Sequence, residues 1–123
     1  MKHILIVDDA ATVRMYHRNI LESAGYGVEE AVNGIEALEK ALQTTFDLYV
    51  VDINMPKLDG YGFLKQMRSQ EITQTPALMV STEAEASDRQ RAFGAGANLY
   101  LVKPVKPEVL LSYVRLLLGE AGT

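Results

Sequence analysis

The feature that most constrains the fold of this chain is the alternation of short apolar runs with longer amphipathic stretches. Apolar residues are almost continuous at 4–7, 46–51, 77–80 and 99–102, and a weaker run occupies 27–31. Such runs are typical of parallel strands that are covered on both faces. We therefore expect five strands, with 27–31 at an edge of the sheet.

The stretches between these runs carry apolar residues at helical spacing. They are residues 11–24, 34–42, 61–70, 84–94 and 107–118. Gly25 follows the first stretch, and Gly94 or Gly96 follows the fourth, where a left-handed residue often ends a helix. An Asn-Gly turn at Asn33 opens the second stretch. The pattern predicts five helices, each after a strand.

Five strand-helix pairs in this order predict a doubly wound α/β domain with a five-stranded parallel sheet. Crossovers between parallel strands are right-handed, and the flavodoxin-like strand order 2-1-3-4-5 is the usual arrangement at this length. The 123 residues suit one domain. We expect that domain to occupy residues 1–119 and residues 120–123 to form a frayed tail.

Composition excludes several classes of function. Twelve Lys and Arg against sixteen Asp and Glu give a net charge of −4, which argues against a broad surface for nucleic acid or anionic membrane. Without cysteine there is no disulfide, thiolate nucleophile or Cys-ligated zinc. No apolar run has the length of a signal peptide or a membrane span. We expect a cytoplasmic protein without membrane insertion or direct nucleic-acid binding.

Carboxylate, hydroxyl and ammonium side chains directly follow four of the expected strands. The first strand ends in Asp8 and Asp9, the third in Asp52, the fourth in Ser81 and the fifth in Lys103. In an open α/β sheet these ends meet at one edge, where ligands bind. Three converging carboxylates suit a hard divalent cation, Mg²⁺ with Mn²⁺ as the alternative. A lysine and a hydroxyl nearby suit a phosphoryl group, and an aspartate can accept one covalently.

Each of these residues alone has a simpler explanation. An aspartate after a strand is usually a helix cap or turn former, and a lone lysine is usually on the surface. Ser81 or Thr82 is most simply the N-cap of the fourth helix, with Glu85 completing a capping box. His3 and His17 are the two histidines, and neither lies near the carboxyl end of an expected strand, so both are expected in structural or surface roles.

Taken together, these residues resemble the response-regulator receiver domain of two-component signalling, and within it the stand-alone, CheY-like members. The resemblance is carried by the acidic pair Asp8 and Asp9, by Ser81, and by two blocks of sequence. These blocks are VDINMPKLDG at 51–60 and YLVKP at 100–104. The four elements occur in the order of the family and span nearly the whole chain.

The resemblance implies a role for each site residue. Asp52 accepts a phosphoryl group from a phosphohistidine of a sensor kinase or a phosphotransfer protein. Asp9, assisted by Asp8, holds Mg²⁺ together with Asp52 and the backbone carbonyl of Asn54. Lys103 bonds the phosphoryl oxygens. The chain is then a phosphoacceptor switch and no enzyme, although it assists its own phosphorylation and dephosphorylation.

The resemblance also implies how the signal leaves the site. Ser81 moves toward the phosphoryl group, and Tyr100 turns inward into the vacated space. Asn54 and Glu83 flank the path of the water that hydrolyses the acyl phosphate. The face made by the fourth helix, the fifth strand and the fifth helix then binds a downstream protein, with chemotaxis or motility as one pathway. We expect a monomer or a weak, phosphorylation-dependent dimer.

Other positions either follow or depart from the family pattern. The resemblance implies a cis peptide before Pro104 and a tight loop at Gly60. Chemotaxis receivers often carry an aromatic residue where this chain has Val105, and many members have alanine where it has Thr82. These departures predict that the packing beneath the switch face and beside the path of Tyr100 differs from that in many members of the family.

Three alternatives compete with this interpretation. A phosphohydrolase of the haloacid dehalogenase type needs a second aspartate two residues after the nucleophile, where this chain has Asn54, and a cap domain does not fit in 123 residues. A pseudo-receiver that acts as a constitutive binding module usually lacks one of the acidic pair, the acceptor or the lysine, all of which are present. The chain is also compatible with the receiver part of a longer regulator.

Overall fold

The computed structural model describes residues 1–120 and contains five strands that alternate with five helices. Their order is β1 (His3–Val7), α1 (Ala11–Ser23), β2 (Gly27–Ala31), α2 (Gly34–Gln43), β3 (Leu48–Val51), α3 (Gly60–Ser69), β4 (Ala77–Ser81), α4 (Ala86–Ala95), β5 (Leu99–Val102) and α5 (Pro107–Leu117). Residues 121–123 of the expected tail lie outside the described residues.

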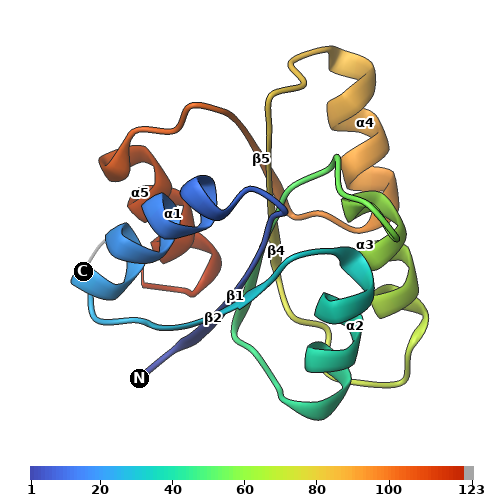
Figure 1. Ribbon diagram of the computed structural model, residues 1–123, viewed down its shortest axis with the longest axis horizontal. Helices are drawn as coiled ribbons and strands as arrows, with labels where there is room; N and C mark the ends of the chain where they lie inside the picture. Colours follow the sequence, from blue (N-terminus) through green and yellow to red (C-terminus); the bar gives the residue numbers. More distant parts are fainter. Residues whose placement is uncertain (121–123) are drawn as a thin grey trace.

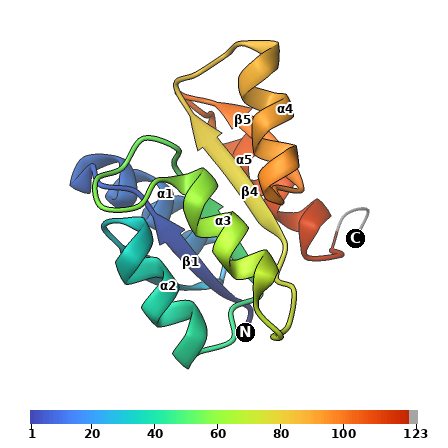
Figure 2. The same ribbon diagram turned by 90° about the vertical axis from the view of Figure 1, so that its right-hand side faces the viewer.

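All strand pairs are parallel, and the sheet order is β2-β1-β3-β4-β5. The expected doubly wound fold, with β2 at an edge, is confirmed. Figure 1 shows α1 and α5 on one side of the sheet and α2, α3 and α4 on the other. Figure 2 shows the second group lying across the face of the sheet. In the described part of the chain no helix is both long and apolar enough to cross a membrane.

Alternate residues of each strand supply two separate cores. On the side of α2, α3 and α4, the core contains Leu5, Tyr49 and Met79. On the side of α1 and α5, it contains Ile4 and Val50 together with residues of both helices. Burial on both faces explains why the strand sequences are continuously apolar instead of alternating.

The fourth helix begins later than expected. The N-cap is Glu85 instead of Thr82, and Asp88 Oδ2 accepts a hydrogen bond of 3.2 Å from Glu85 N. The expected cap at Thr82 is wrong because β4 extends through Ser81, whose Oγ accepts from Glu83 N at 3.1 Å. Residues 82–84 lead the chain away from the sheet, and α4 begins after them.

The other expected helix boundaries agree with the structure to within one residue. Gly25 and Gly96 have positive φ values of 94° and 114° after α1 and α4. Asn33 Oδ1 accepts a hydrogen bond of 2.8 Å from Glu36 N and caps α2. The Lys103-Pro104 peptide is cis, as the resemblance implied.

Among the described helices, α4 has a sparse apolar contact with the rest of the molecule. Its buried residues are Ala92 and Ala95, which have small side chains. Two arginines of α4 lie over aromatic rings of other elements, Arg89 over Tyr100 at 5.4 Å and Arg91 over Tyr61 at 4.3 Å. The helix is therefore held in part by cation–π contacts.

The edge at which the strands begin, the amino edge, is organised around Arg68 at the end of α3. The guanidinium donates to Gly96 O through Nε at 3.1 Å and Nη2 at 2.9 Å, and to Thr75 O through Nη1 at 2.7 Å. Thr75 Oγ1 in turn donates to Phe46 O at 2.9 Å. We call Arg68 and its carbonyl partners Thr75 O and Gly96 O the Arg68 hub.

The first residue of the expected frayed tail is attached to the amino edge. Tyr26 Oη donates a hydrogen bond of 2.7 Å to Glu120 Oε1, and Glu120 N donates to Arg115 O at 2.7 Å. Glu120, the first residue of the expected tail, thus has contacts with α5 and with the segment before β2.

Candidate functional site

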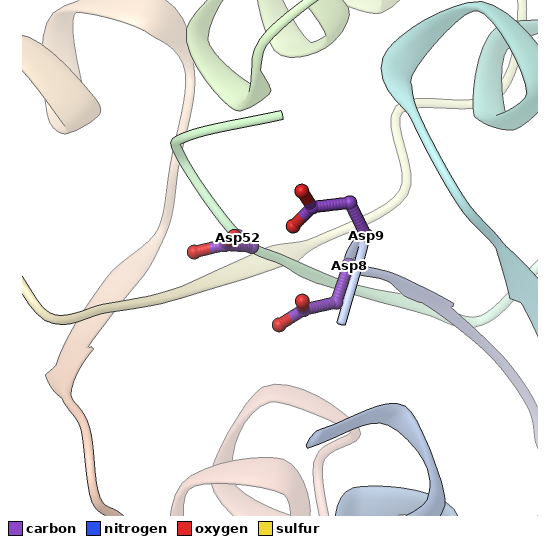
Figure 3. A group of neighbouring side chains, drawn as sticks. All are labelled: Asp8, Asp9 and Asp52. Atoms are coloured by element: carbon purple, nitrogen blue, oxygen red, sulfur yellow. The ribbon is translucent and has the colours of Figure 1, made fainter. Parts of the chain in front are cut away.

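Three carboxylates meet at the carboxyl edge of the sheet, where the strands end. Asp8 and Asp9 follow β1, and Asp52 follows the neighbouring strand β3. Each offers an oxygen that lies within 4.8 Å of the others. Figure 3 shows the three side chains gathered at this edge. Asp8 is buried, Asp52 is partly buried and Asp9 is exposed. The adjacency of β1 and β3 in the sheet creates this cluster from residues more than forty positions apart in sequence.

Hydrogen bonds hold Asp8 in place. Its Oδ1 accepts from Ala10 N at 2.9 Å, and its Oδ2 accepts from Lys103 Nζ at 2.7 Å. Its backbone carbonyl accepts from Arg14 Nη1 at 2.7 Å, and Arg14 Nε is bound to Glu30 Oε1 at 2.8 Å. Asp8 is therefore positioned by Ala10 and Arg14 at the start of α1 and by Lys103 directly after β5.

Lys103 connects β5 with the carboxylates. Its Nζ lies 2.7 Å from Asp8 Oδ2 and 3.3 Å from Asp52 Oδ1. The side chain is 14% exposed, so its charge is only partly screened by water. A single ammonium group thus bridges two carboxylates.

The charges of the cluster do not balance. Burial raises the pKa of Asp52 above its ordinary value; the charge of Lys103 acts against this shift, and the charge of Asp8 adds to it. The cluster holds three carboxylates and Lys103 pairs with two of them, which leaves an excess of negative charge. Three carboxylates, of which that of Asp9 is exposed, supply the oxygen ligands that a hard divalent cation binds.

A second group of residues lies around Glu83, directly after β4. Ser81 is fully buried, and its Oγ accepts from Glu83 N at 3.1 Å. Tyr100 Oη donates to Glu83 O at 2.7 Å, and Asn54 Nδ2 donates to Glu83 Oε1 at 3.2 Å. We call these four residues the Glu83 junction. Tyr100 is 5% exposed, so its ring already points inward in this structure.

The loop between β3 and α3 passes close to Asp52. At Gly60 a Cβ atom would collide with the backbone carbonyl of Asp52, so only glycine fits there. In the same loop Lys57 has a φ of 68°, which is unusual for a residue with a side chain. The backbone next to Asp52 is therefore tightly constrained.

The expected site residues fall into two neighbouring sets. Asp8, Asp9, Asp52 and Lys103 form the carboxylate cluster, and Asn54, Ser81, Glu83 and Tyr100 form the Glu83 junction. Sequence reasoning missed Arg14, which braces the backbone of Asp8 from the first turn of α1. Its pairing with Glu30 across α1 and β2 gave no local signal in the sequence.

The chain matches a family model described as the response regulator receiver domain over residues 4–115. Chemotaxis protein CheY1 of Helicobacter pylori is 38% identical over 120 residues, which cover 94% of this chain and 96% of that protein. The transcriptional regulatory protein ResD of Bacillus subtilis is 38% identical over 119 residues, 97% of this chain but 49% of ResD.

The length of the relatives varies widely. The chain spans about half of ResD and 9% of the sensor protein EvgS of Escherichia coli, to which it is 35% identical over 111 residues. The matched region therefore occurs both as a nearly whole protein and as one part of larger ones.

Solved structures of receiver proteins are also similar to this chain. Chemotaxis response regulator CheY4 of Vibrio cholerae has a TM-score of 0.90 and 40% identity, covering 95% of this chain and 98% of that one. The receiver domain of a sensor histidine kinase from Pseudomonas aeruginosa, with a magnesium ion coordinated in its active site cleft, has a TM-score of 0.89 and 31% identity, with coverage of 96% and 98%.

Proposed function

The chain belongs to the family of response regulator receiver domains of two-component systems, and on this basis we propose that it is a switch operated by phosphorylation of Asp52. The observation that carries the proposal is the position of Asp52 Oδ1, 3.3 Å from Lys103 Nζ within a cluster of three carboxylates. Such a cluster combines a nucleophilic oxygen with a cation that can face phosphoryl oxygens.

We propose Mg²⁺ as the cofactor, with Mn²⁺ as a substitute. Asp8, Asp9 and Asp52 would hold it, together with the backbone carbonyl of Asn54. When bound, the ion supplies positive charge that offsets the carboxylates and the incoming phosphoryl group. The magnesium ion in the related Pseudomonas aeruginosa receiver supports this assignment.

The phosphoryl donor in this proposal is a phosphohistidine of a sensor kinase or a phosphotransfer protein. An oxygen of Asp52 attacks the phosphorus atom, and the bond to the imidazole nitrogen breaks. Lys103, already 2.7 Å from Asp8, faces the transferred oxygens and compensates their charge. The product is an aspartyl phosphate in a partly buried site.

The Glu83 junction links this chemistry to the surface. We propose that Ser81 Oγ, which now accepts from Glu83 N, turns to donate to the phosphoryl group. Glu83 also holds Tyr100 through its carbonyl, and Arg89 of α4 lies over the Tyr100 ring. A phosphoryl group adds nearly two negative charges at neutral pH, so a rearrangement here changes the face formed by α4, β5 and α5.

Asn54 and Glu83 are proposed to set the lifetime of the phosphoryl group. Their side chains meet at 3.2 Å, and both residues are exposed, which places them where water can approach. The protein assists the hydrolysis of its own phosphate and converts no separate substrate. Its output is a changed affinity for a downstream protein, with no role for nucleic acid.

We propose that residues 1–119 form the functional receiver unit, either alone or as part of a longer regulator. The setting is the cytoplasm, and the protein acts as a monomer or as a weak dimer that depends on phosphorylation. A chemotaxis pathway is supported by the similarity to CheY1 and CheY4, although ResD is equally similar in sequence.

The test uses acetyl phosphate and Mg²⁺ as a chemical donor system. Intact-mass analysis is expected to find one added phosphoryl group on the wild-type protein and none on Asp52→Asn. Lys103→Ala is expected to fold normally, yet to lose the amide shifts that beryllofluoride produces on α4 and α5 of the wild type. No phosphoryl adduct, or the same adduct in Asp52→Asn, would contradict the proposal.

A further inference from the structure

An apolar pocket of about 380 Å³ lies next to the carboxylate cluster. Val13 and His17 of α1 form one wall, and Val105 of the loop between β5 and α5 forms the other. Figure 1 shows α1 and α5 side by side on this side of the sheet. The volume falls in the range of sites that bind small molecules, about 300–1,000 Å³.

The pocket shares a wall with the carboxylate cluster. Lys103 lines the pocket, while its Nζ lies 3.3 Å from Asp52 Oδ1. Thr82, the residue directly after Ser81, lines it as well. A molecule whose reactive end reaches Asp52 past Lys103 can therefore place its other end in the pocket.

The pocket favours an uncharged, apolar occupant. Burial lowers the pKa of His17, and the charge of Lys103 lowers it further while that of Asp8 opposes the shift, so the imidazole is neutral at neutral pH. The hydroxyl of Tyr16 is occupied by a hydrogen bond of 3.0 Å to Val105 O. Lys103 remains the cationic group, at the end that faces the carboxylates.

We propose that this pocket binds the acyl group of a small acyl phosphate whose phosphoryl group is transferred to Asp52. This inference rests on the proposed function and names a class of phosphodonor for the same site. Donors whose acyl group is larger and more apolar than acetyl are preferred, because they bury more apolar surface against Val13 and Val105.

The transfer balances without a further reactant. An oxygen of Asp52 forms a bond to phosphorus, and the bond from phosphorus to the acyl oxygen breaks. The bonding pair leaves with that oxygen as a carboxylate, which needs no proton. Lys103 lies between pocket and cluster, where it can face the negative charge that develops on the leaving oxygen.

The first experiment compares benzoyl phosphate with acetyl phosphate, in the presence of Mg²⁺, by the rate of phosphoryl addition in intact-mass time courses. For wild type we expect benzoyl phosphate to be favoured by about tenfold in apparent second-order rate. Thr12→Phe fills the pocket from an exposed position on α1 and is expected to abolish this preference. The matched control is Asn19→Phe, exposed on the same helix but outside the pocket, which should keep it.

The second experiment measures binding without transfer. Phenacylphosphonate and acetonylphosphonate carry a methylene group in place of the bridging oxygen of the two donors. We expect the phenacyl compound to bind about tenfold more tightly in Mg²⁺ and to shift the amide signals of Val13, His17 and Val105. Equal affinities, or shifts confined to other residues, overturn the inference.

The two proposals fail in different ways. If acetyl phosphate modifies Asp52 but the donor preference is the same in wild type and Thr12→Phe, the pocket inference is wrong and the proposed function stands. If neither donor modifies Asp52, the proposed function fails, and the affinities of the two phosphonates still decide whether the pocket binds an acyl group.

Discussion

The two edges of the sheet each place one long cationic side chain among oxygens from distant parts of the chain. At the amino edge, Arg68 faces the carbonyl oxygens of Thr75 and Gly96. At the carboxyl edge, Lys103 faces the carboxylates of Asp8 and Asp52, with Asp9 close by. The geometry is similar, but the acceptors are neutral at one edge and charged at the other.

Because of this difference, the amino edge stabilises the fold, whereas the carboxyl edge provides the candidate site. The Arg68 hub joins three segments through neutral acceptors, and each of its bonds stabilises the native state. At the carboxyl edge the negative charges outnumber the single lysine, and burial makes their repulsion stronger. A site that is short of positive charge is ready to bind a cation, at a cost to the stability of the free protein.

The largest effect is expected from removal of the cation at the amino edge. Arg68→Ala leaves the carbonyls of Thr75 and Gly96 without their donor, which we expect to lower the free energy of unfolding by about 3 kcal/mol. Urea denaturation measures the change. Lys65→Ala, at an exposed position of the same helix, is the control with almost no expected effect. A loss below about 1 kcal/mol for Arg68→Ala would remove the contrast between the two edges.

The second effect comes from supplying the missing charge at the carboxyl edge. Mg²⁺ at a hundred times its dissociation constant is expected to raise the free energy of unfolding by about 2.7 kcal/mol, because only the folded protein holds the three carboxylates together. Thermal or urea unfolding with and without Mg²⁺ measures this. Asp9→Asn is expected to weaken the response strongly, whereas the exposed Glu71→Gln near the amino edge leaves it intact. An equal response in both variants rules out the cluster as the binding site.

Removal of one negative charge tests the same imbalance without metal. In the presence of EDTA at neutral pH, Asp52→Asn is expected to be more stable than wild type by about 1 kcal/mol. The reason is that burial raises the pKa of Asp52, so its ionised form is disfavoured in the folded protein. Guanidinium denaturation of both proteins measures the difference.

The pH dependence of that difference has a definite sign. A carboxyl group with a raised pKa holds its proton more tightly in the folded state than in the unfolded state. The stability that Asp52 contributes to the wild type is therefore lost as pH rises from the unfolded value of 3.8 through the raised value of Asp52, and the loss is complete above it. The advantage of Asp52→Asn should grow over this window and then stay constant. An advantage that shrinks with rising pH contradicts the assignment.

The smallest effect concerns the backbone beside Asp52. Lys57 has a φ of 68°, a conformation that glycine adopts without steric cost. Lys57→Gly is expected to stabilise the protein by about 0.5 kcal/mol, since relief of strain exceeds the extra entropy of the unfolded chain. Lys65→Gly, inside α3, should destabilise it by about 1 kcal/mol, which makes the pair a matched test in thermal unfolding.

The carboxyl edge could be located from the sequence because its residues directly follow apolar runs. Asp8, Asp52 and Lys103 each lie within one residue of a strand end, so the topology alone brings them together. The Arg68 hub could not be predicted in the same way. It depends on a side chain that reaches backbone carbonyls up to 28 positions away, and carbonyls carry no sequence signal.

The start of α4 shows the same limit. Thr82 and Glu85 fit a capping pattern in the sequence. In the structure Ser81 still belongs to β4, and a turn around Glu83 precedes α4. The sequence predicts a structural or surface role for His17, and its burial is consistent with a structural one. Its place in the wall of the pocket beside Lys103 depends on how α1 packs against the loop after β5.

Because α4 has few buried apolar side chains, it is expected to open locally more often than the strands of the sheet. With Ala92 and Ala95 as its buried side chains, the helix has little apolar area to lose when it detaches. Its amide protons should therefore exchange with deuterium through local opening, well before those of β3, whose residues are all buried. Arg89 already lies over the Tyr100 ring, so a rearrangement that loosens this contact should speed the exchange of α4 amides further. The protection of these amides therefore reports the state of the proposed switch.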